Sequence, residues 1–353
     1  MSTASIRDFV KAVPGTSSAA RQFRGWRKTL RNLPQSMVML AVEGYLRTAK
    51  RRTLADEVQR LEEQLVLERN HTPRLQRLLD GKITFLDVGA RYGPPFHFAQ
   101  YGDFFDFFLV EPEPEEAARL RAAGYHVIDK ALADEVGEVT LKVTAKPGSS
   151  SIIEPAGPLM TYRMADHSIH RVIDRIALPS TTIDTVAREQ GVAFHAMKFD
   201  TQGSETIIMR GMAEARPMVI LSEVFTGAIY QQRPTFYDVC ADLYDRGYLP
   251  YWFRLSRIPP PAERFRPDGR GWPGLPISGD AGFIPDWTRP EGQALILQDD
   301  LRYAAIMLIV GLEDVLRFVI EQLDLPNADR IRDALAIAPA RKRIAQGNMA
   351  LKP

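Results

Sequence analysis

The chain has 353 residues, of which 45% are hydrophobic and 25% charged, and its formal net charge is +1. This composition is typical of a globular protein with a large core. A net charge this small provides no overall field that would attract a nucleic acid, so we expect no nucleic-acid partner. Cys240 is the single cysteine, which excludes an intrachain disulfide and a cysteine-based metal cluster. A reducing compartment, the cytoplasm, is therefore expected.

The N-terminal region, residues 1–79, is predicted to be helical. Residues 1–60 contain twelve Lys or Arg and four Asp or Glu, a local excess of +8, with Phe23 and Trp26 among the basic residues. Such a segment is typical of a helix on an anionic membrane surface, here the inner face of the cytoplasmic membrane. The alternative is a solvated helix that packs its aromatic residues on the main domain. No secretory signal and no membrane-spanning stretch are expected.

Two further regions predict helical contacts. Leu54, Val58, Leu61 and Leu65 follow one another at spacings of four, three and four, which resembles a short heptad seam. We expect this segment to form a homodimer contact or to cover the main domain. The C-terminal region, residues 291–353, is also predicted to be helical, because residues 301–323 are strongly apolar with helical spacing. Its helices are expected to pack on the N-terminal helices or on a second subunit.

The central domain, residues 80–290, begins with an apolar run from Ile83 to Val88 that is followed by Gly89 and Gly93. This pattern predicts a buried parallel strand, a tight turn, and a helix whose N-terminal amides receive a ligand. A second apolar run ends at Glu111, eighteen residues after Gly93. In dinucleotide sites an acidic residue near that separation binds the ribose hydroxyls. The alternative is that Glu111 only caps the next helix.

More strands are predicted within 125–129, 139–143, 176–181, 196–200, 217–223, 247–253 and 281–285. Four acidic residues stand where predicted strands end: Asp87, Glu111, Asp200 and Glu223. The carboxyl ends of parallel strands meet at one edge of a sheet and line its ligand cleft. Like charges in one cleft repel one another unless something compensates them, so four acids there predict a functional site. Cys240 lies on the apolar side of a predicted helix, 236–245, and is expected to be a core residue.

Several of these segments, in this order, resemble the FkbM family of S-adenosylmethionine-dependent methyltransferases. They are Asp87-Val-Gly-Ala-x-x-Gly93, Val110-Glu-Pro112, Lys130-Ala-Leu-Ala-Asp134, Thr182-Ile-Asp184 and Lys198-Phe-Asp-Thr-Gln-Gly-Ser-Glu205. The resemblance covers roughly residues 82–285. It implies an α/β fold, a Rossmann-like class I methyltransferase sheet of seven strands with the last one antiparallel, with helical extensions at both ends. Arg91-Tyr92 and Pro94-Pro95 depart from the family pattern.

The resemblance also implies a cofactor, S-adenosyl-L-methionine, lying across the strand ends. Asp200 would then lie beside the transferable methyl and Glu223 near the acceptor, and both are the catalytic candidates. The cofactor-binding candidates are Asp87, Gly89, Ala90, Gly93, Glu111, Pro112, Asp129 and Ala131. Asp129 and the backbone near Ala131 would face the adenine. His195 is a weaker candidate base, and no metal site is predicted, although Asp200 with Glu223 leaves a divalent ion open.

The predicted function is O-methylation of a sugar hydroxyl on a glycan, a glycolipid or a saccharide-bearing metabolite. Methyl transfer from a sulfonium is an in-line displacement, so the protein mainly aligns the reactants, and a base helps because a sugar hydroxyl is a poor nucleophile. The alternative is a non-catalytic S-adenosylmethionine-binding or adapter protein that assembles through its terminal helices. An NAD-dependent dehydrogenase is disfavoured because no third glycine completes the G-x-G-x-x-G pattern.

Overall fold

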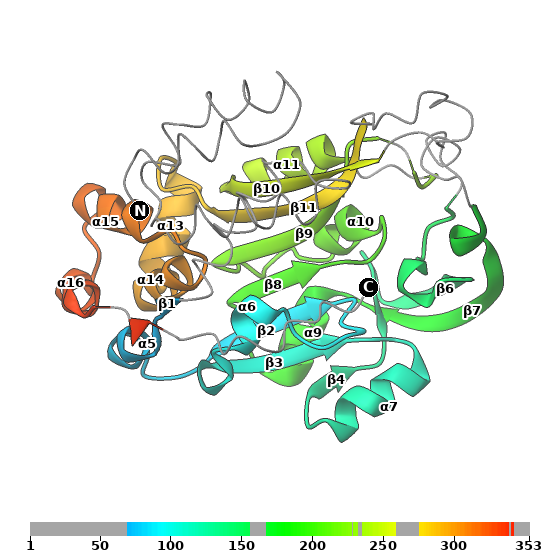
Figure 1. Cartoon of the computed structure of the whole chain (residues 1–353), viewed down its shortest axis with the longest axis horizontal. Helices are drawn as coiled ribbons and strands as arrows, with labels where there is room; N and C mark the ends of the chain where they lie inside the picture. The colour runs from blue at the N-terminus through cyan, green and yellow to red at the C-terminus, as the bar shows by residue number, and fades with distance from the viewer. Residues whose placement is uncertain are drawn as a thin grey trace, which may run out of the picture. The chain divides into compact units, whose positions relative to one another are not determined.

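The computed structural model describes residues 69–155, 167–227, 229–231, 235–258, 275–338 and 340–341 (Figure 1). The chain divides into two compact units, residues 70–340 and residues 1–69 with 341–353. The basic N-terminal segment, the heptad-like seam, the loop 259–274 and the end of the chain after 341 lie outside the described residues. The predictions made for those segments therefore stay predictions.

Seven strands form the main sheet of the larger unit, in the order β10-β11-β9-β8-β2-β3-β4. Neighbours from β4 to β9 are parallel, whereas β11 is antiparallel to both β9 and β10. The predicted α/β sheet with an antiparallel last strand is therefore confirmed. The strands are β2 (Ile83–Val88), β3 (Phe105–Val110), β4 (His126–Ile128), β8 (Ala196–Phe199), β9 (Val219–Phe225), β10 (Tyr248–Ile258) and β11 (Leu275–Pro285).

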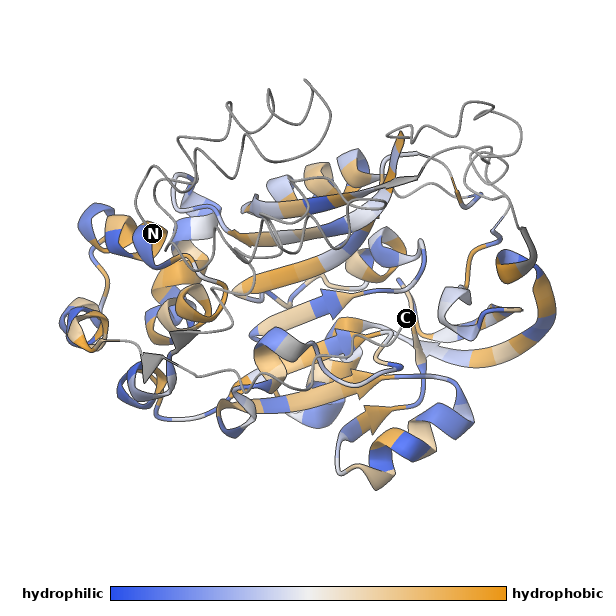
Figure 2. Ribbon diagram, viewed as in Figure 1, coloured by the Kyte–Doolittle hydropathy of each residue, from blue (hydrophilic) through white to orange (hydrophobic). Residues whose placement is uncertain are grey.

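The central strands are mostly apolar because both faces of the sheet are covered. In β2, Ile83 and Phe85 belong to one hydrophobic cluster, and Leu86 and Val88 belong to the cluster on the other face. Figure 2 shows these strands as mostly hydrophobic ribbon, whereas the surface helices are mixed. This double burial is why the strands could be located as uninterrupted apolar runs.

Helices cover each face. On one face lie α9 (Ile183–Gln190), α10 (Glu205–Arg210) and α11 (Phe236–Asp245). On the other lie α5 (Thr72–Leu78), α6 (Phe96–Ala99), α14 (Asp300–Ile309), α15 (Glu313–Gln322) and α16 (Ala328–Ala336). Two more helices, α7 (Pro114–Ala122) and α13 (Pro290–Gln298), contact β4 and β11 respectively. Cys240 packs half-buried against the first set, as the helical pattern predicted.

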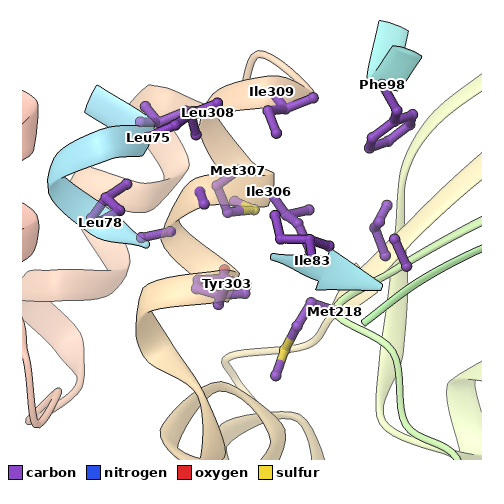
Figure 3. Close-up of a cluster of buried hydrophobic side chains, with 14 of the residues drawn as sticks. Leu75, Leu78, Ile83, Phe98, Met218, Tyr303, Ile306, Met307, Leu308 and Ile309 are labelled. Carbon is purple, nitrogen blue, oxygen red and sulfur yellow. The ribbon is translucent and has the colours of Figure 1, made fainter. Parts of the chain in front are cut away.

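The helix predicted across residues 301–323 is two helices in the structure. Gly311, with φ of 82°, ends α14 in the left-handed region that favours glycine, and α15 begins at Glu313. Figure 3 shows Leu75 of α5 beside Leu308 of α14, and Ile306 of α14 beside Ile83 of β2. The C-terminal helices α13–α16 thus pack within the larger unit.

An ion pair and two carbonyl contacts join α5 to these helices. The side chain of Arg74 is only 4% exposed. Its guanidinium donates to the Glu313 carboxylate at 2.6 Å and to the backbone carbonyls of Ile337 at 2.6 Å and Leu335 at 3.4 Å. A buried guanidinium needs such partners, because an unpaired charge in the interior is strongly unfavourable.

A second sheet of three strands stands beside the carboxyl ends of the main sheet (Figure 1). It consists of β5 (Ala131–Leu132), β6 (Gly137–Thr144) and β7 (Val172–Thr181) in the order β5-β7-β6.

The remaining described elements are short. The 3-10 helices are η2 (Gly102–Phe104), η3 (Pro147–Ser149) and η4 (His167–His170), and β1 (Arg69–Asn70) pairs with β12 (Ala340–Arg341). Among the helices that the structure describes, none has the length and apolar character needed to cross a membrane.

Candidate functional site

A cavity of about 290 Å³ lies at the carboxyl ends of the central strands. One wall comes from the loops after β2, β3 and β8, and the other comes from the three-stranded sheet and the segment around η3. The polar or flexible lining residues are Gly89, Arg91, Glu111, Glu113, Gly148, Ser150, Ser151, Asp200, Thr201, Gln202 and Ser204. The cavity thus lies where the four strand-end acids predicted a cleft.

Backbone contacts with the ends of β3 and β8 hold the loop after β2 in place. Gly89 has φ of 83°, and a Cβ at this position would lie 2.1 Å from the carbonyl oxygen of Asp200. Glycine is therefore required for a positive φ and for the close approach of two strand ends. The amides of Gly89 and Ala90 both donate to the Val110 carbonyl, at 3.1 and 3.2 Å. The sequence assigned Gly89 to the ligand, and the structure adds this packing role.

The predicted helix follows this loop, but its N-terminal residues are not among those that line the cavity. The next helix, α6, begins only at Phe96 and has four residues. Pro94 and Pro95 lack N–H groups, and proline disfavours helical backbone in the residue before it. Gly93 has φ of 88° and no atom within 4 Å of a Cβ built on it, so it turns the chain without close packing.

Glu111 is a buried carboxylate at the end of β3 and is only 6% exposed. One of its oxygens accepts a hydrogen bond from the Glu113 amide at 3.0 Å. Burial raises the pKa of Glu111, and the Glu113 amide and the nearby Arg91 guanidinium oppose this shift. Arg91 itself pairs with the Glu113 carboxylate and lines the cavity. Glu111 and Glu113 also line the cavity, and Glu113 is in addition the N-cap residue of α7.

Lys198 lies between two of the predicted acids. Its ammonium is 3.3 Å from Asp87 and 3.1 Å from Asp200. Asp87 and Lys198 are register partners on β2 and β8, so the strand pairing itself places them together. Burial raises the pKa of Asp87 to about 6, and Lys198 opposes that rise. Burial alone would lower the pKa of Lys198, but the two carboxylates outweigh it and raise the pKa. The expected charge compensation is thus present.

Gln202 connects Asp200 to another of the four acids, Glu223. Its side-chain amide donates to Asp200 at 3.3 Å and to Glu223 at 2.7 Å. The Tyr230 hydroxyl donates to the amide oxygen of Gln202 at 3.1 Å, which fixes the nitrogen toward the carboxylates. Gln202 has φ of 58°, the only positive φ at a non-glycine position among the described residues. Such strain is found where the surrounding structure holds a residue in place.

Glu205 fixes the backbone of the loop that contains Gln202. Its carboxylate, 1% exposed, accepts hydrogen bonds from the amides of Thr201 at 3.0 Å and Gly203 at 3.2 Å. Burial raises the pKa of Glu205 to about 7. A Cβ on Gly203, whose φ is 101°, would lie 2.6 Å from the Tyr230 ring. The Lys-x-Asp-x-Gln-Gly-x-Glu segment therefore folds as one hydrogen-bonded turn that presents Asp200 and Gln202 to the cavity.

The structure brings some of the predicted residues to the cavity and leaves others outside it. Gly89, Glu111, Pro112, Ala131 and Asp200 line the cavity.

Other predicted residues do not line it. Asp87, Ala90, Gly93 and Glu223 lie in the loops and strands behind these residues. Asp129 has a side chain 59% exposed that pairs with Arg121 at 2.6 Å.

His195 lies at the opposite edge of the sheet from the cavity. It precedes β8, and its Nδ1 accepts a hydrogen bond from the Thr84 amide at 3.1 Å. Burial lowers the pKa of His195 to about 4. This position removes it from the candidates for a base that acts at the strand ends.

Three residues of this site received no role from the sequence: Lys198, Gln202 and Tyr230. The first two belong to the segment that carried the family resemblance, so the spacing was the available signal. Tyr230 stands in a loop with no local pattern. Within the part of the chain that the structure describes, no group of three or more His, Cys, Asp or Glu side chains is placed to hold a metal ion.

The strand order and the single antiparallel reversal at β11 define a class I methyltransferase fold, with the cavity at the edge where such folds bind ligands. Residues 87–250 match the family model described as the methyltransferase FkbM domain. The resemblance found in the sequence is therefore confirmed over these residues. The match begins at Asp87 and includes the whole Lys198–Glu205 turn.

Solved structures give a weaker likeness. A variant of MtNAS in complex with S-adenosylmethionine is 11% identical, covering 78% of this chain and 82% of that one, with a TM-score of 0.28. The 1,6-didemethyltoxoflavin-N1-methyltransferase of Burkholderia thailandensis, with bound S-adenosylhomocysteine, is 14% identical, covering 72% and 91%, with a TM-score of 0.28. No curated protein matches the chain. The fold is assigned from the strand order of the main sheet and not from these two structures.

Proposed function

We propose that this protein is an S-adenosyl-L-methionine-dependent O-methyltransferase that acts on a sugar hydroxyl of a glycan, a glycolipid or a saccharide-bearing metabolite. The observation that carries the proposal is one cavity bordered by both the buried Glu111 and the partly exposed Asp200, in an FkbM methyltransferase domain. The choice of a sugar hydroxyl is supported by the family resemblance alone.

The residues of the cavity fit this cofactor. Glu111 is a buried acceptor, one of whose oxygens already accepts the Glu113 amide, and a ribose supplies two hydroxyl donors. Val110, Ala131 and Leu132 add apolar surface beside it, suited to a purine ring. S-adenosylmethionine, when bound, supplies a methyl group already activated on a sulfonium.

The chain's own groups would then position the acceptor and receive its proton. Asp200 is the candidate base, because its carboxylate lines the cavity and is 40% exposed. Lys198 and Gln202 each donate to one of its oxygens, which fixes the orientation of the carboxylate. The positioned base would add to the alignment of the reactants, which is the main contribution that a protein makes to such a displacement.

We also propose that the basic N-terminal segment places the enzyme at the inner face of the cytoplasmic membrane, and that the terminal helices form a homodimer. The support is the excess of +8 within residues 1–60 and the heptad-like spacing from Leu54 to Leu65. Sedimentation with anionic liposomes in rising salt tests the first idea, which fails if the protein stays in the supernatant at low salt.

Calorimetric titration of S-adenosylmethionine and of NAD tests the proposed function. We expect S-adenosylmethionine to bind and NAD not to bind. Glu111→Gln keeps the shape but removes the charge, and a hydrogen bond to a charged group contributes about 1.5–3 kcal/mol. Affinity should therefore fall by about 10- to 150-fold, while Glu115→Gln, on the exposed side of α7, changes nothing. Absence of S-adenosylmethionine binding overturns the proposal, and an unchanged affinity of Glu111→Gln overturns only the ribose assignment.

A further inference from the structure

One wall of the cavity is an apolar sheet face that the proposed chemistry does not use. Leu141 and Val143 of β6 alternate along one strand, and Leu141 is paired directly with Ile176 of β7. Residues paired across antiparallel strands, and residues two apart on one strand, share a face. Leu141, Val143, Ile176 and Leu178 all line the cavity, and Ile176 is still 37% exposed.

This face extends away from the side assigned to the cofactor. Ala131, at that side, pairs with Ser180 of β7. Ile176 lies four residues further along the same strand, about 13 Å at 3.3 Å per residue. Leu178, 8% exposed, stands between the two positions. The part of the face formed by Leu141, Val143 and Ile176 is therefore remote from the predicted adenine contact.

The same end of the face joins the side that carries the candidate base. Lys142 and Ser151 exchange backbone hydrogen bonds of 2.8 and 3.3 Å, so the segment after η3 runs beside β6. The next residues include Ile153, which packs in one hydrophobic cluster with Phe225 and Tyr230. Tyr230 donates to Gln202, which contacts Asp200. An acceptor whose hydroxyl approaches Asp200 thus has apolar surface next to it.

We infer that the acceptor is an alcohol with an apolar group beside its sugar, as in a glycolipid or a glycosylated apolar metabolite, and that Leu141, Val143 and Ile176 bind that group. The inference rests on the proposed function and narrows its substrate class, because a free polar glycan would leave this face without a partner. The charged groups of the cavity, Arg91, Glu111, Glu113 and Asp200, lie on the opposite wall, so one acceptor can satisfy both walls only if it is polar at one end and apolar at the other.

The probes are methyl β-D-glucoside and n-hexyl β-D-glucoside, titrated into the protein saturated with S-adenosylhomocysteine. Each CH₂ group removed from water contributes about 0.8 kcal/mol, which is roughly a fourfold gain in affinity. With two or more groups seated on the face, the hexyl glucoside should bind at least about tenfold more tightly. Ile176→Asn should remove most of this difference.

Ile173→Asn is the matched control, because Ile173 is on the same strand, is 58% exposed and does not line the cavity. It should keep the full preference for the hexyl glucoside, and both variants should bind S-adenosylhomocysteine as the parent does. Equal affinities for the two glucosides in the parent overturn this inference alone. Loss of S-adenosylhomocysteine affinity in Ile176→Asn also overturns it, since the face would then contact the adenine. Absence of S-adenosylhomocysteine binding in the parent overturns the proposed function as well.

Discussion

Two glycines of the loop after β2 allow a paired test of how the site is built. Both have positive φ, 83° at Gly89 and 88° at Gly93. Only Gly89 is packed, since a Cβ there would lie 2.1 Å from the Asp200 carbonyl oxygen, while a Cβ on Gly93 meets nothing within 4 Å. Replacing each with alanine therefore separates the effect of backbone conformation from the effect of steric overlap.

The expected losses of stability differ. Left-handed backbone costs an L-residue about 1–2 kcal/mol, and the reduced freedom of the unfolded chain returns about 0.4–1 kcal/mol. Gly93→Ala should therefore destabilise by roughly 1 kcal/mol. In Gly89→Ala the Asp200 backbone must also move by about 1 Å, which adds about 1–3 kcal/mol of overpacking. The same movement weakens the hydrogen bond of 3.0 Å from the Asp200 amide to the Val88 carbonyl.

Urea unfolding monitored by circular dichroism measures the difference in the free energy of unfolding between the two variants. The dependence of this free energy on urea concentration, the m-value, should be the same for both. Gly89→Ala should be less stable than Gly93→Ala by about 1–3 kcal/mol. S-adenosylmethionine affinity should fall with Gly89→Ala as well, because Gly89 and Asp200 both line the cavity. Equal destabilisation by the two substitutions would refute the view that Gly89 is needed for the approach of the two strand ends.

Two further predictions concern stability. Because the pKa of His195 is lowered in the folded chain, the unfolded chain binds a proton at a pH where the folded chain does not. The contribution of His195 to the free energy of unfolding is therefore constant above about pH 6.5 and falls by roughly 1–2 kcal/mol as the pH drops toward 4. His195→Asn keeps an acceptor for the Thr84 amide and should lose this part of the pH dependence in thermal melts, and an unchanged slope would contradict the assignment. Arg74→Met should destabilise by about 3–5 kcal/mol in urea, because it leaves Glu313 partly buried and two carbonyls unpaired. Arg77→Met, which removes an ion pair whose two side chains are 52% and 62% exposed, should change less than about 1 kcal/mol, and equal losses would show that burial of Arg74 is unimportant.

The main sheet was predictable because its strands are buried on both faces. Polar and apolar residues do not alternate regularly along Ile83–Val88 or Phe105–Val110, as they would in a strand with one face exposed. An acidic residue or a glycine follows the end of each run. The strand predicted at 139–143 exists as β6, but periodicity alone could not show that it belongs to the second sheet. That placement depends on its pairing with β7, about 40 residues further along the chain.

The candidate site was predictable as a set of residues and less so as an arrangement. Strand ends place Asp87, Glu111 and Asp200 at one edge of the sheet, which the alternation of strands and helices implies. The sequence did not reveal that Lys198 would stand between two of them, because this follows from register pairing between β2 and β8. The contact of Tyr230 with Gln202 is likewise tertiary and has no local pattern.

The contact of α5 with the C-terminal helices has a consequence for synthesis on the ribosome. Leu75, Leu78 and Ile83 are fully buried, yet their partners Ile306 and Leu308 are made more than 220 residues later. At about 5–20 residues per second, that separation corresponds to roughly 10–50 s of translation. During this time α5 and β2 lack the part of their cover that α14 provides in the folded chain (Figure 3). Exposed apolar surface on a nascent chain can associate with other chains. We therefore expect chaperones to bind the start of this domain during synthesis.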